Sequence, residues 1–227
     1  MSGAKQWSDS PGRRRLLSAA AEEFSRNGYA GTSIAAIAAR AAVSKSTIFH
    51  HFDCKKALYV AVIEAAAGDF ASTLDQVLVT RRQARESLSD FQQAHLAHLH
   101  KNEQVAMLVL RELQGDGPGE SSGIVSEVLA GNYNRLVQYL AAARDKGEVR
   151  VDADLEVAAL VMFAANAFAF QTRQVLKDFP GLDIERQPER FTAAVSDLIF
   201  RGLRHGELEG ELEGDTNEKW LLRRIRG

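Results

Sequence analysis

The chain has little of what marks secreted, membrane or catalytic proteins. Its single cysteine, Cys54, excludes an internal disulfide framework and a cysteine-rich zinc site. No N-terminal stretch resembles a signal peptide, and the longest apolar run, residues 157–170 interrupted by Asn166, falls short of the roughly 20 residues that span a bilayer. We find no Gly-rich phosphate loop, nucleophile constellation or acid/base pair. These absences favour a soluble cytoplasmic protein that is not an enzyme and carries no cofactor.

Charge is unevenly distributed along the 227 residues, although the formal net charge is only −2. Residues 1–60 hold nine basic and four acidic side chains, whereas the remainder holds 19 basic and 26 acidic ones. A basic N-terminal part on an acidic body places any surface that binds a polyanion at the N-terminus.

Hydrophobic periodicity predicts an all-α fold, with no convincing strand or repeat. We expect a helix from Arg13 to Asn27 that ends at Gly28, and a long helix from near Cys54 towards Val79, capped by Asp53. Further helices are expected at residues 83–101, 103–114, 122–146, 152–177 and 188–204, separated by Gly- and Pro-containing breaks.

Residues 32–58 carry the most informative pattern. Thr32 can cap a helix whose inward residues Ile34, Ile37, Ala38 and Ala41 follow helical spacing. Ser44 can cap the next helix, which buries Ile48 and Phe52. A helix of about two turns is too short to be stable alone, so neighbouring helices must hold it. Two short helices joined by a tight turn are typical of a helix-turn-helix, whose second helix enters a DNA groove.

The segment resembles the DNA-binding region of the TetR family of bacterial transcriptional regulators. The matching positions are Gly28-Tyr29, Thr32, Ile37-Ala38, Ala41, Val43-Ser44-Lys45, Phe49, His51-Phe52, Lys55 and Leu58. Family members usually have Gly at the position of Ala42, and Tyr, whose hydroxyl typically reaches a phosphate, at that of Phe49. If the turn needs a left-handed backbone, Ala42 costs about 1 kcal/mol.

The resemblance implies a set of DNA-contacting residues. His50 is the better candidate for reading a base, and His51 is expected at a phosphate. Lys45 and Lys55 are expected at a phosphate or a base. An alternative is that the lysines are ordinary solvated side chains and that Ser46 and Thr47 serve only the helix start. The complete set is Thr32, Ser33, Ser44, Lys45, Ser46, Thr47, Phe49, His50, His51 and Lys55.

Beyond residue 60 the resemblance implies a helical domain for a small, often hydrophobic effector and for dimerisation. A mainly apolar pocket with polar anchors would use Arg111, Gln114, Phe163, Asn166 and Phe170, although such aromatic residues are more often plain core. Apolar residues on the last two helices predict a two-fold interface that includes Val161, Ala165, Phe168, Phe191, Val195 and Leu198. The triplet His95, His98 and His100 lacks further ligands at metal-binding spacing, and we predict no metal site.

The sequence thus predicts a flexible arm (residues 1–12), a helix-turn-helix DNA-binding domain (13–60), a helical ligand-binding and dimerisation domain (61–205) and a flexible tail (206–227). The expected function is a homodimeric regulator, by resemblance a repressor, that binds a palindromic double-stranded DNA operator and is released by a small hydrophobic effector. An alternative is a helical binding protein for a hydrophobic metabolite with only non-specific DNA affinity. An enzyme built on a helical bundle is a weaker third option.

Overall fold

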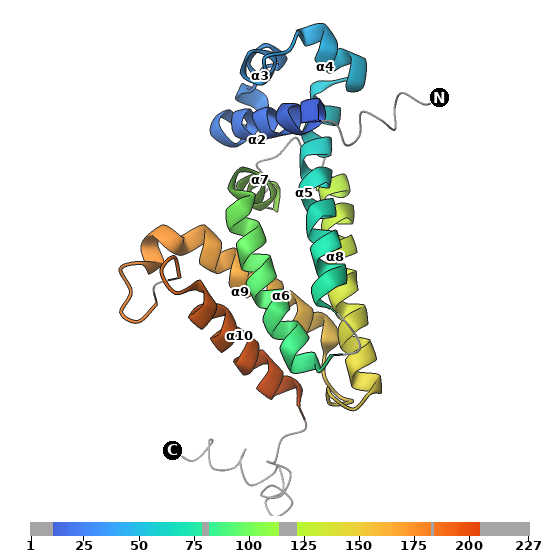
Figure 1. The fold of residues 1–227 in the computed structure, drawn as a ribbon, viewed down its shortest axis with the longest axis vertical. Coiled ribbons are helices and arrows are strands. Elements are labelled where there is room, and N and C mark those ends of the chain that lie inside the picture. The colour runs from blue at the N-terminus through green and yellow to red at the C-terminus, as the bar shows by residue number, and fades with distance from the viewer. Residues whose placement is uncertain (1–10, 79–81, 114–121, 183, 205–227) are drawn as a thin grey trace, which may run out of the picture.

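The computed structural model describes residues 11–78, 82–113, 122–182 and 184–204, and within them the chain forms helices and no strand. The expected arm and tail lie outside these residues, apart from Pro11 and Gly12, which begin the first helix. Figure 1 shows the described helices: α2 Pro11–Gly31, α3 Ile34–Ala41, α4 Lys45–His51, α5 Lys55–Val77, α6 Ala84–Lys101, α7 Glu103–Leu113, α8 Ser122–Asp145, α9 Leu155–Leu176 and α10 Pro188–Leu203. The all-α prediction is confirmed.

Helices α2 to α4 and the first half of α5 form what we call the N-terminal module, at one end of the molecule (Figure 1). Its core is built around the aromatic residues Phe24 and Tyr59, whose ring centroids lie 5.0 Å apart. The remaining buried core residues of the module include Leu16, Leu17, Ala20, Ala21, Ile37, Ala38, Ile48, Phe52, Leu58, Val62 and Ile63. Leu108 of α7 closes the same core, so the module packs directly on the rest of the chain.

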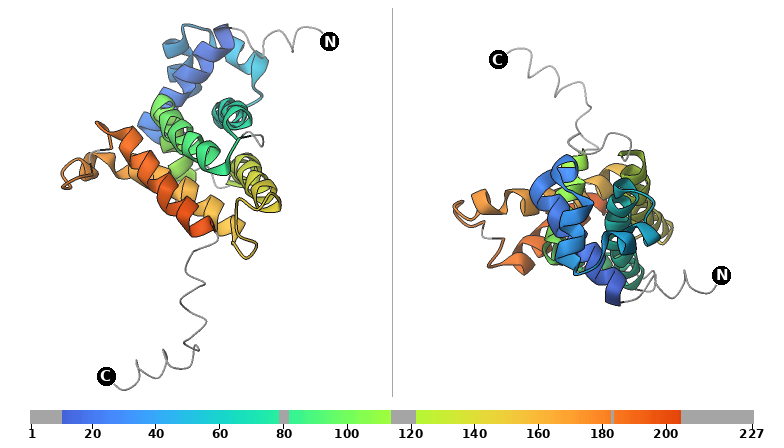
Figure 2. Two further views of the ribbon diagram at one scale, coloured as in Figure 1. Left: turned by 60° about the horizontal axis from the view of Figure 1, so that its bottom comes forward. Right: turned by 90° about the horizontal axis from the view of Figure 1, so that it is seen from above.

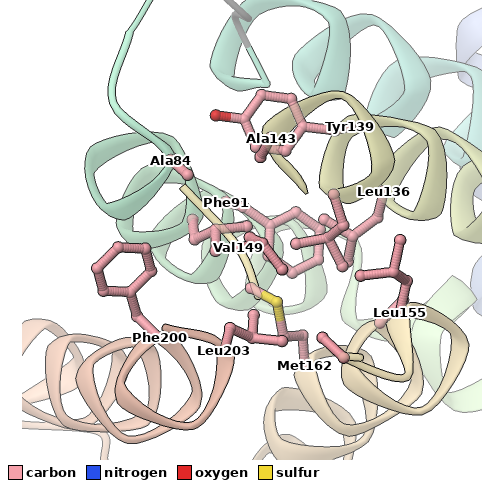
Figure 3. Close-up of a cluster of buried hydrophobic side chains, with 14 of the residues drawn as sticks. Ala84, Phe91, Leu136, Tyr139, Ala143, Val149, Leu155, Met162, Phe200 and Leu203 are labelled. Carbon is pink, nitrogen blue, oxygen red and sulfur yellow. The ribbon is translucent and has the colours of Figure 1, made fainter. Parts of the chain in front are cut away.

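The second half of α5 and helices α6 to α10 form the helical body. In both figures α8 runs beside α5, and α10 lies beside α6 and α9 (Figures 1 and 2). Figure 3 shows the main body core, where side chains from α6, α8, α9 and α10 converge around Phe91 and Met162. Labelled members of this core are Ala84, Leu136, Tyr139, Ala143, Val149, Leu155, Phe200 and Leu203.

Helix starts differ from the expectation at two places. Ser33, and not Thr32, is the N-cap of α3, and its hydroxyl accepts from the Ala36 amide at 3.1 Å. The N-cap of α5 is Cys54, and not Asp53, with no side-chain capping bond. Ser44 caps α4 as predicted and accepts from the Thr47 amide at 3.0 Å.

Two helices are long and apolar enough, by length and composition alone, to cross a membrane: α5, and α9, which extends beyond the apolar run noted in the sequence. The apolar run itself, residues 157–170, is shorter than α9, which has 22 residues because it includes flanking positions. In the most apolar 18-residue stretch of each helix, 44% of α5 and 33% of α9 is buried inside the protein.

The two turns of the module depend on unusual backbone angles. The continuous α2 is kinked at Gly28, whose φ of 69° and ψ of 171° are readily adopted only by glycine. At the end of α3, Ala42 has the left-handed φ of 54° and ψ of 45°. Its amide donates to Ala39 O at 3.2 Å and the Val43 amide to Ala38 O at 3.0 Å, so the carbonyls at the helix end are satisfied.

Replacing Ala42 with glycine should stabilise the protein. Ala42→Gly removes the steric cost of the left-handed conformation and should raise the free energy of unfolding by about 1 kcal/mol, measured by urea denaturation. The control is Ala39→Gly, at an exposed position inside the same helix. This substitution should lower the free energy of unfolding by about 1 kcal/mol. A destabilised Ala42→Gly variant would contradict the argument.

Stability should also fall in mild acid because of a buried histidine. Burial, reinforced by nearby His98, lowers the pKa of His95 from its ordinary 6.5 to about 3. The unfolded chain therefore binds a proton below pH 6.5 that the folded chain does not bind until about pH 3. The free energy of unfolding should fall by about 1.4 kcal/mol for each pH unit below 6.5.

This dependence can be measured by urea denaturation between pH 7 and pH 5. His95→Phe should flatten the profile even if it lowers stability at pH 7, because Phe removes the titrating group. His98, whose pKa burial also lowers, should retain a smaller dependence of the same sign. Equal slopes in the wild type and in His95→Phe would rule out this origin.

Candidate nucleic-acid interface

Helix α4 presents a polar outer face to solvent. Ile48 and Phe52 are buried in the module core, so the opposite side of the helix carries Ser46 and His50, both exposed. Lys45 and Phe49 are exposed along one edge of this outer face, and Thr47 and His51 are partly buried along the other. The arrangement brings most of the residues predicted to contact DNA onto one surface.

Hydroxyl groups cluster at the beginning of this face. The Ser44 Oγ atom lies 2.7 Å from Ser46 Oγ and 2.8 Å from Thr47 Oγ1. Because a hydroxyl both donates and accepts, these groups are suited to phosphate oxygens or base edges while they still serve the helix start. Ser33 is exposed at the start of α3 and is the second capping residue of the surface.

The two adjacent histidines differ in environment. Their ring centroids lie 4.9 Å apart at a steep interplanar angle. Partial burial, followed by the charge of His50, lowers the pKa of His51. This direction favours the uncharged form of His51, whose ring can still donate one hydrogen bond to a phosphate.

Thr32 does not belong to the surface. Its side chain is 3% exposed, and its hydroxyl donates to Glu23 O at 3.0 Å and to Gly28 O at 2.7 Å. The hydroxyl predicted to contact DNA is thus occupied at the kink of α2. Both acceptors lie within nine residues of Thr32, at the end of α2, and the kink at Gly28 brings them to the hydroxyl.

Lys55 is partly buried, and its ammonium group is largely occupied within the protein. Nζ donates to Tyr29 O at 2.7 Å and to Thr32 O at 2.9 Å, and it lies 4.3 Å from the centroid of the Tyr29 ring. An ammonium has three N–H groups, so one is left for a phosphate. The residue predicted as a phosphate ligand is therefore first of all a clamp on the turn between α2 and α3.

Ion pairs missed in the sequence fix α3 against α2. The Arg40 guanidinium donates to Glu23 Oε1 at 2.6 Å and to Glu22 Oε2 at 2.9 Å. These carboxylates, with Glu23 foremost, raise the pKa of Arg40. Pairs between residues 17 and 18 positions apart have no local signal, but they orient the helix that precedes the turn.

The predicted effector residues divide into separate places. Phe163 and Asn166 lie together on α9 beside His95 of α6, whereas Phe170 is buried in another cluster, with the Arg173 guanidinium 4.4 Å from its ring. Arg111 donates to Ser25 O at 2.9 Å and so contacts the N-terminal module instead. Gln114 lies outside the described residues.

A buried polar cluster joins α6 and α9 at this point. Gln92 Nε2 donates to Met162 O at 3.2 Å, and Asn166 Nδ2 donates to Gln92 O at 3.0 Å and lies 3.2 Å from His95 Nδ1. The side-chain oxygens of Gln92 and Asn166 are buried and have no hydrogen-bond donor among the described residues. Gln92 was missed in the sequence, where a lone glutamine on a helix carries no functional signal.

The other predicted body sites have distinct surroundings. His95 and His98 both pack against the Phe70 ring, whereas His100 packs near Phe170, so His100 lies apart from the other two histidines. A cleft of about 470 Å³ lies between α6 and the α9–α10 region, lined by Gln93, Leu96, Ala97, His100, Ile184, Glu185, Pro188, Glu189 and Thr192. None of the predicted effector residues lines this cleft.

An exposed apolar surface runs along α9 and onto α10. Phe168 is 63% and Leu198 72% exposed, and Val161 is also exposed. Ala165, Phe191 and Val195 are only partly exposed, and Phe191 packs on the core near Phe170. Val157 and Leu160 extend the same surface towards the start of α9. The six residues predicted for a dimer interface therefore divide into an exposed group and a partly buried group.

Known proteins match this chain in two ways. Residues 16–62 match the model of the bacterial regulatory proteins of the tetR family. The Escherichia coli (strain K12) transcriptional regulator UidR is 47% identical over 53 residues, which is 23% of this chain and 27% of UidR. The chain thus matches about a quarter of the length of this curated relative.

Solved structures extend the likeness to the whole fold. The fatty acid degradation regulator FadR from Bacillus halodurans has a TM-score of 0.72 at 23% identity, covering 87% of this chain and 99% of that one. The regulator FadR from Bacillus subtilis, in complex with stearoyl-CoA, has a TM-score of 0.70 at 21% identity, covering 84% and 99%. At these identities the structures show the fold alone. Residues 16–62 therefore resemble the DNA-binding segment of the bacterial regulatory proteins of the tetR family, and the described remainder of the chain shares the fold of such regulators.

Proposed function

We propose that this chain is a transcriptional regulator that acts in the cytoplasm and binds double-stranded operator DNA through the outer face of α4. The observation that carries the proposal is the exposed set Lys45, Ser46 and His50 on a short helix fixed by the module core. The charge of the chain supports it, because the basic part of the sequence is the part that holds this face.

A homodimer on a palindromic operator is the assembly that we propose. Large apolar side chains are exposed on α9 at Val157, Leu160, Val161 and Phe168 and on α10 at Leu198. A second copy of the chain would cover them, and a two-fold operator requires such a partner. The two outer faces of α4 would then enter half-sites about 34–36 Å apart.

We further propose that a small, largely apolar effector releases the DNA, which would make the protein a repressor. The place that supports this best is the region of Phe163 and Asn166. There Phe163 packs against Phe91 and His95, and the buried side-chain oxygens of Gln92 and Asn166 have no donor among the described residues. Acyl-CoA thioesters are the first compounds to test for release, since the similarly folded FadR from Bacillus subtilis was solved with stearoyl-CoA.

The DNA proposal is tested by fluorescence anisotropy on the DNA that flanks the protein's own gene, against scrambled DNA, across a salt series. We expect a preference of at least ~10³ for the flanking DNA. Lys45→Ala should weaken binding to both DNAs and reduce the salt slope by about 0.9 if Lys45 contacts one phosphate. His50→Ala should lower mainly operator affinity, by about 1–3 kcal/mol.

Lys177→Ala, which removes an exposed lysine of the body, is the charge-matched control and should change neither DNA affinity. One outcome would contradict the DNA proposal: weak, salt-sensitive binding of equal strength to both DNAs, and no preferred site after selection from random-sequence DNA. That outcome would instead support a metabolite-binding protein with non-specific DNA affinity. An equal loss on both DNAs from His50→Ala would exclude base reading by that residue.

The assembly is tested with a charge on the apolar surface. Phe168→Glu should convert a dimer into a monomer in sedimentation equilibrium, because a carboxylate would be buried without a partner, and it should weaken operator binding at least tenfold. Val151→Glu makes the same kind of change at a position that is 74% exposed between α8 and α9, and it should remain dimeric. A dimeric Phe168→Glu protein would place the interface elsewhere.

A further inference from the structure

Phe49 stands out on the outer face of α4. Its side chain is 50% exposed, whereas Phe24, Phe52 and Tyr59 of the same module are all buried. Among the described residues of the module, 11–63, Phe49 is the one large apolar side chain that is exposed to this degree. The module core therefore does not account for the ring.

The neighbours of Phe49 are polar and suited to DNA. Lys45 precedes it by one helical turn on the same edge, and His50 follows it at the centre of the outer face. When α4 enters a major groove, side chains on the edge of its outer face lie between the base edges and the sugar-phosphate backbone. Unlike those side chains, a phenyl ring neither donates nor accepts a conventional hydrogen bond.

The apolar group that a major groove offers is the 5-methyl group of thymine, and phenylalanine is among the side chains that contact it. We propose that Phe49 packs against the 5-methyl group of one thymine in each operator half-site and so helps to determine sequence specificity. This inference rests on the proposed function, because it requires that α4 enters the groove. Packing of the ring on deoxyribose alone would give affinity without specificity.

The test removes one methyl group at a time from the DNA. After the operator has been defined with wild-type protein by footprinting, each thymine is replaced by deoxyuridine, and affinities are measured by anisotropy. One thymine per half-site should be sensitive, with a loss of about fourfold for one replacement and roughly fifteenfold for both, as expected for burial of one methyl group each. Phe49→Ala protein should bind thymine and uracil operators equally at that position.

Variants of the same side chain separate a contact from a folding defect. Phe49→Leu keeps an apolar group and should retain part of the thymine preference. Phe49→Tyr keeps the ring and should retain all of it, and any phosphate contact of the added hydroxyl would strengthen binding to every DNA. Phe179→Ala removes an equally exposed phenylalanine from the body and should leave the preference unchanged. Thermal melting of each variant checks that the module is folded.

Two results would overturn the inference while leaving the proposed function intact. One is specific operator binding with no thymine sensitive to loss of its methyl group. The other is a sensitivity that persists unchanged in Phe49→Ala, which would assign the methyl contact to another residue. Absence of any specific operator would contradict the proposed function itself, and the thymine contact would fail with it.

Discussion

Helix α5 belongs to two hydrophobic cores, and this shared membership is the constraint on which the arrangement depends. Its first half contributes Leu58 and Val62 to the N-terminal module, and its second half contributes Phe70 and Leu74 to the body. A packed core resists small displacements of its members, so the two halves cannot move independently without bending the helix. At its first turn, Lys55 extends the connection to the carbonyls that precede α3.

A second connection joins the same two parts through α7. Arg111 of α7 donates to Ser25 O, a carbonyl in the turn of α2 that precedes the kink at Gly28. A cation at this end of a helix is also favoured by the helix dipole. Only Asn102 separates α7 from α6, so a displacement of α6 is passed through α7 to α2.

Periodicity predicted every described helix to within a few residues, because each helix buries one side of a regular pattern. Sequence reasoning did not predict the hydrogen bonds that several site side chains make within the protein. Thr32 and Lys55 matched a family motif and were assigned to DNA, yet both hold the turn at the kink of α2. Arg111 was assigned to an effector, yet it bonds a carbonyl 86 residues away. The pairings of Lys55 and Arg111 arise from tertiary packing, which local spacing does not encode.

Helix α9 shows a further limit of pattern reasoning, because it is apolar on more than one side. Met162 and Asn166 face inward and Val161 and Phe168 outward, but all lie within one stretch that has no clear polar face. A helix of this kind needs partners on both sides. Inside the chain, Asn166 joins it to α6, where we propose the effector acts. In the proposed dimer its outer side joins it to the second copy, so a shift of α9 would alter the spacing of the two DNA-binding faces.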